Sequence, residues 1–291
     1  MPYFLLGLRM LADSSNTVLA KRFSRSMNSD MLHFIEYNLF NASFATVFLF
    51  AINKFSFKMN GATLIYSLIF AALVILSVSL NVLAHKRVSV YLVGLTSQLG
   101  SLIISTFFGI IFLDDPVTPE GIISMLLMIS AVVIPYIGQI EKGKKGSILV
   151  PVLYFMIGGA VNVVMKVFTL DSRVTDSRSF FIASNIVIVA ATACALAAYI
   201  IVEPKHCRDL LHAFTLREIG NVAARTTLSN VSSVLGIIVL SGMTLGVYTV
   251  ATSSFGIISG AFLSLAVFRE RLNIATCISV ILALAAVVVA A

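Results

Sequence analysis

Long apolar runs, separated by short polar segments, follow one another along the whole chain. Each run has about the 20 residues that an α-helix needs to cross the ~30 Å hydrocarbon core of a bilayer. The period-two alternation of a membrane β-barrel is missing, and backbone groups in lipid must be satisfied within each segment. The pattern therefore predicts an all-α integral membrane protein with ten transmembrane helices. They are expected at residues 3–20, 31–52, 60–84, 89–113, 119–140, 147–168, 180–202, 217–240, 243–267 and 272–291.

The composition supports a chain embedded in lipid. Of the 291 residues, 59% are hydrophobic and 11% are charged, whereas about 25% of the residues of a soluble domain are charged. The first apolar run ends in Lys21 and Arg22 and not in a small-residue cleavage site, so no cleaved signal peptide is expected. We therefore expect a multi-pass protein of the cell membrane (inner or plasma membrane), surrounded by the lipid bilayer.

The net charge of +7 is distributed unevenly between the two sides of the predicted bundle. Most lysines and arginines lie in loops that follow odd-numbered helices, whereas loops after even-numbered helices hold only Lys54, Lys58, Arg173 and Arg178. The positive-inside rule would place the basic loops in the cytoplasm and both termini outside. No loop is long enough to form a nucleic-acid-binding domain, so no nucleic-acid partner is expected.

The sequence offers no arrangement typical of a metal site, a cofactor site or a catalytic site. Cys194, Cys207 and Cys277 are scattered, and neither a CxxC nor an HExxH spacing occurs. No nucleophile and base stand at a catalytic spacing, and the adjacent Asp114 and Asp115 are typical of a turn. We therefore expect neither an enzyme nor a bound cofactor or metal.

An internal repeat becomes visible when residues 97–115 are aligned with residues 252–270. Small residues then coincide at positions one helical turn apart, and such a ridge lets membrane helices pack closely. A second similarity joins residues 16–21 to residues 162–166, because each stretch runs from an asparagine to a lysine. The coinciding small residues are Ser97 and Thr252, Ser101 and Gly256, Ser105 and Gly260, and Gly109 and Ser264.

The repeat divides the chain into two halves of five helices, residues 1–140 and 147–291, joined by the polar linker 141–146. Because five is an odd number, the second half must enter the membrane inverted relative to the first. Inverted repeats are frequent in secondary transporters, whose substrate site lies near the midplane between the two halves.

The order of these features resembles the drug/metabolite transporter superfamily, EamA type. The likeness includes small-residue fourth and ninth helices that end in acidic residues, and it is strongest over residues 253–284, where a Glu-Arg turn separates two apolar helices. The proline often found within those two helices is absent, with Gln98 and Ser253 near that depth. The resemblance implies a transporter with both termini in the cytoplasm, opposite to the charge distribution, so the orientation stays open.

Three polar residues, Arg9, Asp13 and Asn16, share one face of the first predicted helix. An ionisable group at the centre of a span costs ~2.5–3.5 kcal/mol, so it normally faces a cavity or a partner. Either the Arg9–Asp13 pair fixes the helix against its neighbours, or this face lines a central cavity. In the second case Asp13 would accept a proton or contact a cation, and Arg9 would bind an anionic group.

Arg225 lies within the eighth predicted helix, with no opposite charge within one helical turn. Its planar guanidinium is suited to a carboxylate or a phosphate. The partner can come from another helix, with Asp13 and Glu36 as candidates, or from a substrate, and the sequence favours neither.

Two further charged residues lie close to the ends of predicted helices. We expect the Glu36 side chain to extend to water at the interface, and its alternative role is proton coupling, for which Asp13 is the other candidate. The Lys166 ammonium is expected to reach water along the lipid, but the family resemblance keeps Lys166 as a candidate at the cavity entrance. The uncharged candidates for the substrate site are Gln98, Asn162, Tyr248 and Ser253, each of which could equally join helices.

These residues favour a secondary active transporter of a small polar metabolite, amino acid-like, zwitterionic or anionic, that works by alternating access with proton coupling or exchange. The short loops and the lack of a GxxxxGK[ST] motif argue against ATP as the direct energy source. The alternatives are a flippase for a lipid-linked head group and an exchanger of nucleotide sugars or phosphorylated metabolites. A monomer or a homodimer is expected.

Overall fold

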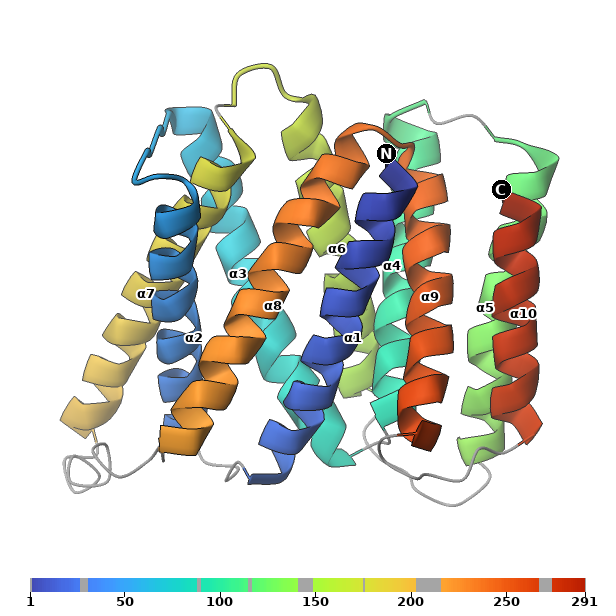
Figure 1. Cartoon of the computed structure of the whole chain (residues 1–291), viewed down its shortest axis with the longest axis horizontal. Helices are drawn as coiled ribbons and strands as arrows, with labels where there is room; N and C mark the ends of the chain where they lie inside the picture. The colour runs from blue at the N-terminus through green and yellow to red at the C-terminus, as the bar shows by residue number, and fades with distance from the viewer. Residues whose placement is uncertain are drawn as a thin grey trace.

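The computed structural model of the chain describes residues 2–26, 31–87, 90–114, 117–140, 149–174, 176–202, 216–266 and 274–290. These residues form ten α-helices and no strand (Figure 1). The helices are α1 (Pro2–Ser26), α2 (Met31–Ile52), α3 (Gly61–Arg87), α4 (Val90–Phe112), α5 (Pro119–Ile140), α6 (Leu149–Leu170), α7 (Ser177–Val202), α8 (Leu216–Ser241), α9 (Leu245–Ala266) and α10 (Ile274–Ala290).

Six helices of the described chain are long and apolar enough to cross a membrane. This agrees with the predicted all-α membrane protein. The candidate spans are Ile35–Ile52, Gly61–Asn81, Leu153–Leu170, Ser177–Val202, Glu218–Ser241 and Leu245–Leu263.

The helix boundaries follow from local sequence signals. α3, α5, α7 and α9 each begin after a side chain that accepts a hydrogen bond from the backbone N–H three residues later, at 2.8 to 3.4 Å. Such N-caps satisfy a backbone donor that has no partner within the helix. α1 continues to Ser26, beyond its predicted end at residue 20, because the arginines and the lysine that follow the apolar run are favourable helix formers. The capping residues are Asn60, Thr118, Asp176 and Thr244.

Successive helices run in opposite directions, so both ends of the chain lie at one end of the bundle (Figure 1). We call this end the termini face, and it also carries residues 53–60, 171–174 and 242–244. The other end, where α1 stops at Ser26 and α7 stops at Val202, is the opposite face.

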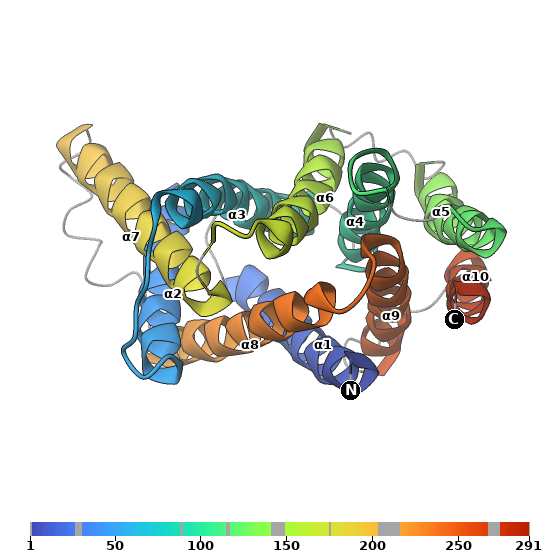
Figure 2. The same ribbon diagram turned by 90° about the horizontal axis from the view of Figure 1, so that it is seen from above.

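Helices from the two halves of the chain pack against one another throughout the bundle. α1 packs on α8, α2 on α7 and α5 on α10, and α4 contacts both α6 and α9. Figure 2 shows the α5–α10 pair at one end of the bundle and α7 at the other. The α4–α6 contact is close, because a Cβ added to Gly100 would collide with the backbone of Phe155, and one added to Gly159 would collide with Ile104.

The buried residues of α1, α3 and α7 are concentrated towards the termini face. The buried residues of α7 all lie between Ser179 and Thr192, and those of α3 whose side chains the structure describes lie between Thr63 and Ala71. No residue from 193 to 202 in α7 or from 72 to 81 in α3 is buried. In α1, the buried residues that the structure describes end at Ala12. α1, α3 and α7 are therefore packed closely near the termini face and less closely towards the opposite face, whereas α2 is also buried near the opposite face, at Leu32 and from Ile35 to Asn38.

Candidate functional site

Arg9 of α1 lies against Tyr248 of α9, close to the level where the tight packing of α1 ends. Its Nη1 donates a hydrogen bond to Oη of Tyr248, and its Cζ lies 4.9 Å from the centroid of the tyrosine ring. Arginine remains charged in proteins, and the face of an aromatic ring attracts a cation. Tyr248 is fully buried, so it holds the guanidinium within the protein and not in lipid.

Asp13 approaches the same guanidinium one helical turn further along α1. Its Oδ2 lies 3.6 Å from Nε of Arg9, which is an ion pair but not a hydrogen bond. The Nε atom is buried and has no hydrogen-bond partner among the described residues. The Arg9 side chain is 15% exposed and that of Asp13 is 47% exposed, so the pair marks the boundary between the buried and the accessible parts of α1.

Gly236 of α8 makes room for this contact. A Cβ built on it would lie 3.1 Å from Cζ of Arg9 and 3.2 Å from Oη of Tyr248, which is too close for an undisturbed fit. We call Arg9, Asp13, Gly236 and Tyr248 the Arg9 group. The sequence reasoning missed Gly236, although an isolated glycine within an apolar helix is a signal of close approach.

Arg225 of α8 forms a second group with the same face of α1. Its Nε donates a hydrogen bond of 3.3 Å to Oδ1 of Asn16, and its Cζ lies 5.4 Å from the ring centroid of Tyr37 in α2. We call Arg225, Asn16 and Tyr37 the Arg225 group. The structure thus places the three candidate residues of α1 in two groups, Arg9 and Asp13 with Tyr248 and Asn16 with Arg225. Tyr37 was missed because only the fold brings it to Arg225.

Glu36 does not extend to the interface, contrary to the sequence-based expectation. The residue is 3% exposed, and its Oε2 is buried without a hydrogen-bond partner among the described residues. The early position of Glu36 in α2 suggested an accessible side chain, but the packing of neighbouring helices covers it. A buried carboxylate oxygen without a donor is costly, which keeps Glu36 among the candidates for proton coupling.

Lys166 does not reach water along the lipid either. Its Nζ donates hydrogen bonds of 3.2 Å to the carbonyl of Leu240 and 3.0 Å to that of Met243. These carbonyls lie at the C-terminal end of α8 and in the turn after it, where helix carbonyls lack partners and a cation is favourable. Lys166 is buried, so in this conformation it joins α6 to the α8–α9 turn.

The described contacts of Asn162 do not include either arginine group. Nδ2 of Asn162 donates a hydrogen bond to Oγ of Ser101, which joins α6 to α4. Ser253 is fully buried in α9. Gln98 belongs to α4, but its side chain lies outside the described part of the structure. Among the described residues, no cluster of three or more His, Cys, Asp or Glu could hold a metal ion.

Comparison with known proteins supports the fold and names no family. No protein-family model matches the chain, and no curated protein matches it. A protein whose crystal structure is known matches over 99% of this chain and 96% of its own, with a TM-score of 0.63 and 15% sequence identity. At this identity the likeness shows that the two chains share a fold.

Proposed function

We propose that the chain is a secondary active transporter of a small zwitterionic or anionic metabolite, built from ten transmembrane helices in two inverted repeats as in the EamA-type transporters that its sequence resembles. The proposed substrate site comprises the Arg9 group and the Arg225 group. Transport would proceed by alternating access in the cell membrane, driven by a proton or by exchange.

The observation that carries this proposal is the exposure of Asp13. This carboxylate lies halfway along the 25-residue α1, yet its side chain is 47% exposed. A charge at this depth is unfavourable in lipid, so its exposed surface is best explained by a water-accessible space between helices. Arg9 and Tyr248 would then form the inner end of that space.

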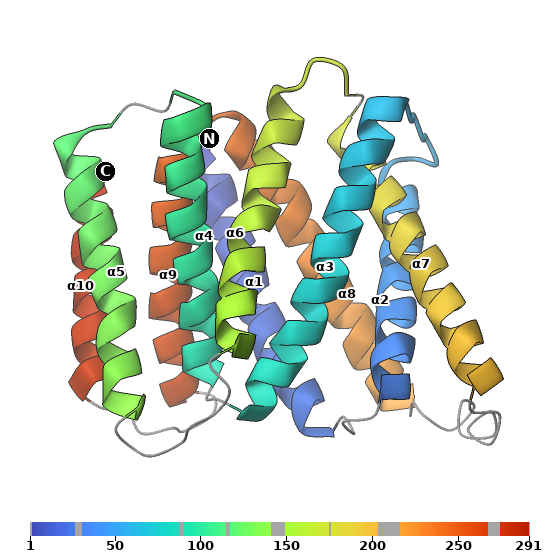
Figure 3. The same cartoon turned by 180° about the vertical axis from the view of Figure 1, so that it is seen from behind.

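The helix pairing supports the inverted repeat. In an inverted repeat of five helices, each helix corresponds to the one five positions earlier or later, as α1 does to α6. The contact α1–α8 then corresponds to α6–α3, α4–α6 to α9–α1, and α2–α8 to α7–α3, and all these pairs are in contact. The pairs α2–α7, α4–α9 and α5–α10 correspond to themselves. α1 and α6 run in opposite directions (Figure 3), as an inverted second half requires.

The charges of the two groups favour a substrate that carries an anionic centre. The groups contain two arginines, Arg9 and Arg225, and one carboxylate, Asp13. A guanidinium binds a carboxylate or phosphate through parallel hydrogen bonds. A zwitterion such as an amino acid would place its carboxylate at an arginine and its ammonium at Asp13, whereas a simple cation would meet net repulsion.

Uptake into reconstituted vesicles tests the proposal. Ligands are first identified by thermal shift of the purified protein against metabolite pools, since a ligand that binds only the folded state raises the melting temperature. Uptake of the radiolabelled ligand should require Arg225 and Asp13, so Arg225→Ala and Asp13→Asn should abolish it while both proteins still insert. Arg178→Gln, an exposed change at the termini face, serves as the matched control.

The same vesicles separate the mechanisms. Uptake that follows an imposed pH gradient, and loses this response in Glu36→Gln, indicates proton coupling, whereas uptake driven only by preloaded substrate indicates exchange. Stabilisation by lipid-linked head groups alone, with movement of labelled lipid between leaflets, would favour the flippase. Wild-type uptake by the Arg225 and Asp13 variants would remove both residues from the site.

A further inference from the structure

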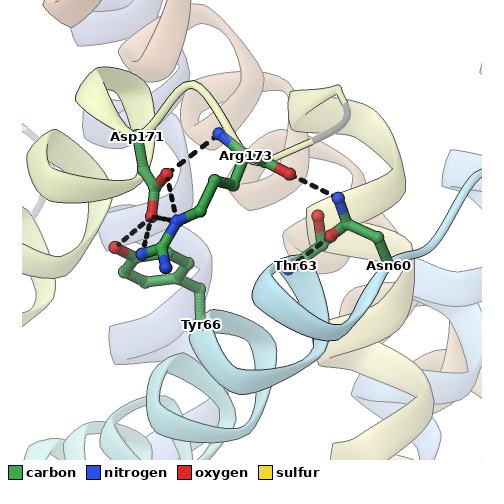
Figure 4. A network of polar contacts seen from close by, with 5 residues as sticks. All are labelled: Asn60, Thr63, Tyr66, Asp171 and Arg173. Carbon is green, nitrogen blue, oxygen red and sulfur yellow. Dashed lines mark hydrogen bonds and ion pairs between the residues drawn. The ribbon is translucent and has the colours of Figure 1, made fainter.

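A network of polar contacts joins α3 to the segment after α6 at the termini face (Figure 4). Oη of Tyr66 donates a hydrogen bond of 3.0 Å to Oδ2 of Asp171. Asp171 also accepts from Arg173, with 2.7 Å between Nη2 and Oδ2 and 3.0 Å between Nε and Oδ1. Nδ2 of Asn60 donates to the carbonyl of Arg173. We call Asn60, Tyr66, Asp171 and Arg173 the latch.

A layer of aromatic rings lies directly next to the latch. Tyr66 belongs to both, because its ring meets that of Phe168 edge-on at 5.9 Å while its hydroxyl binds Asp171. Phe168 stacks on Phe180 at 4.2 Å, and Phe70 contacts Phe180 at 5.1 Å and Phe181 at 5.7 Å. Phe168, Phe180 and Phe181 are at most 2% exposed. This aromatic layer brings α3, α6 and α7 into one packed unit.

The latch and the aromatic layer both lie beside the buried parts of α3 and α7. Neither helix has a buried residue at 72–81 or 193–202, towards the opposite face. In the described conformation α3, α6 and α7 are therefore held together at the termini face. We infer that the latch is a gate: Asp171 and Arg173 release Tyr66 and Asn60 when the termini face opens, and the aromatic layer separates with them. This inference rests on the proposed transport function for its purpose, but its geometry is independent of any substrate.

The arginine contacts of the latch are exposed to water and the aromatic contacts are buried, so the gate can be stable when closed and can still open. The Arg173 side chain is 76% exposed, whereas that of Asp171 is 11% exposed, so water can replace the arginine contacts as they break. Exposed ion pairs contribute little free energy each. The aromatic layer supplies the buried apolar contact. The hydrogen bond from Tyr66 to Asp171 fixes the position of the Tyr66 ring against Phe168.

A cysteine placed behind the latch would report opening. Ser67 of α3 is fully buried, and its Oγ donates a hydrogen bond of 3.2 Å to the carbonyl of Phe180. In a background with Cys194, Cys207 and Cys277 replaced by serine, Ser67→Cys should react slowly with a water-soluble maleimide. Adding Asp171→Asn or Tyr66→Phe should raise the rate about tenfold, because the reagent reacts only with the open form. Adding Arg173→Gln should raise it less, about two- to fivefold, because the arginine contacts are exposed to water.

Matched variants separate a gate from general destabilisation. Arg178→Gln removes a positive charge from the same face, as Arg173→Gln does, but no described contact of its side chain reaches α3, so the labelling rate should not change. Tyr66→Phe keeps the ring contact with Phe168 and removes only the hydroxyl. Equal labelling of the three latch variants and the parent, with all proteins eluting as folded monomers or dimers, would overturn the inference.

Closing the gate covalently completes the test. In the same background, with Ser67 retained, Asn60→Cys and Arg173→Cys are bridged by a short, reducible bifunctional thiol reagent. Bridging should stop uptake into vesicles, and reduction should restore it; uptake at the unbridged rate would overturn the gate. If no solute is transported at all, the transport proposal fails, while faster labelling of the latch variants would still support a termini face that opens.

Discussion

The guanidinium of Arg9 lies over the ring of Tyr248, with its Cζ 4.9 Å from the ring centroid, although the two residues stand 239 positions apart in the chain. This contact joins α1 to α9. A buried cation is thereby held by a ring and a hydroxyl, and its nearest described carboxylate, at Asp13, approaches only to 3.6 Å. Such an arrangement leaves a positive centre beside an accessible carboxylate.

Tyr248→Phe should destabilise the protein. The substitution keeps the ring under Arg9 but removes the oxygen that accepts from Nη1. Leaving a donor of a buried charged group without a partner costs about 1–3 kcal/mol, which should appear as a lower melting temperature in detergent. Tyr154→Phe is the control, since it removes the oxygen that accepts 2.7 Å from Nδ2 of Asn81, a neutral donor. An equal decrease in the melting temperature of both variants would contradict a special role for the charge of Arg9.

Gly236→Ala should reduce transport more than it reduces stability. The new methyl group would crowd Arg9 and Tyr248 at 3.1 to 3.2 Å and displace the guanidinium, while alanine is favoured over glycine within a helix by about 1 kcal/mol. Gly220→Ala in the same helix is the matched control, because nothing lies within 4 Å of its added Cβ. Uptake and melting curves of both variants test this prediction. Uptake at the wild-type rate by Gly236→Ala would show that the methyl group does not displace the Arg9 guanidinium.

The sequence predicted the helical architecture because hydropathy depends on local composition alone. Lengths of apolar runs marked the helix positions, but the charged residues after the first run extended α1 to Ser26. The sequence also identified the polar residues of α1, Tyr248 and Arg225 as candidates, because ionisable and hydrogen-bonding groups are conspicuous within apolar helices.

The partners of those residues could not be read from the sequence, since they depend on which helices meet. Tyr37 and Gly236 became parts of the site only through the packing of α8 against α2 and α1. The positions of Lys166 and Glu36 near helix ends predict side chains that reach the interface, yet neighbouring helices bury both. Burial by a distant segment leaves no local signal, and this is why the two expectations were wrong.

Lys166→Met should weaken the end of α8. The substitution retains an apolar stem of similar length but removes the ammonium that binds the carbonyls of Leu240 and Met243. Loss of these charged hydrogen bonds at a helix C-terminus should lower the free energy of unfolding by about 1–3 kcal/mol. Hydrogen exchange should accelerate at the α8–α9 turn before other regions. Lys54→Gln, at an exposed position, should leave both measurements unchanged, and protection at the turn equal to wild type would contradict the capping role.

The contribution of Asp171 to stability should depend on pH only under strongly acidic conditions. Hydrogen bonds from the side chain and backbone of Arg173 lower the pKa of Asp171 far below its ordinary value, and the hydroxyl of Tyr66 acts in the same direction. A lowered pKa in the folded state gives a stabilisation that is complete above the unfolded-state pKa of about 3.9 and is lost as the pH falls towards the folded-state pKa. The difference in melting temperature between wild type and Asp171→Asn should therefore be constant from about pH 5 to 8 and shrink below about pH 4. A difference that vanished already near neutral pH would show that the carboxylate is not held ionised by Arg173.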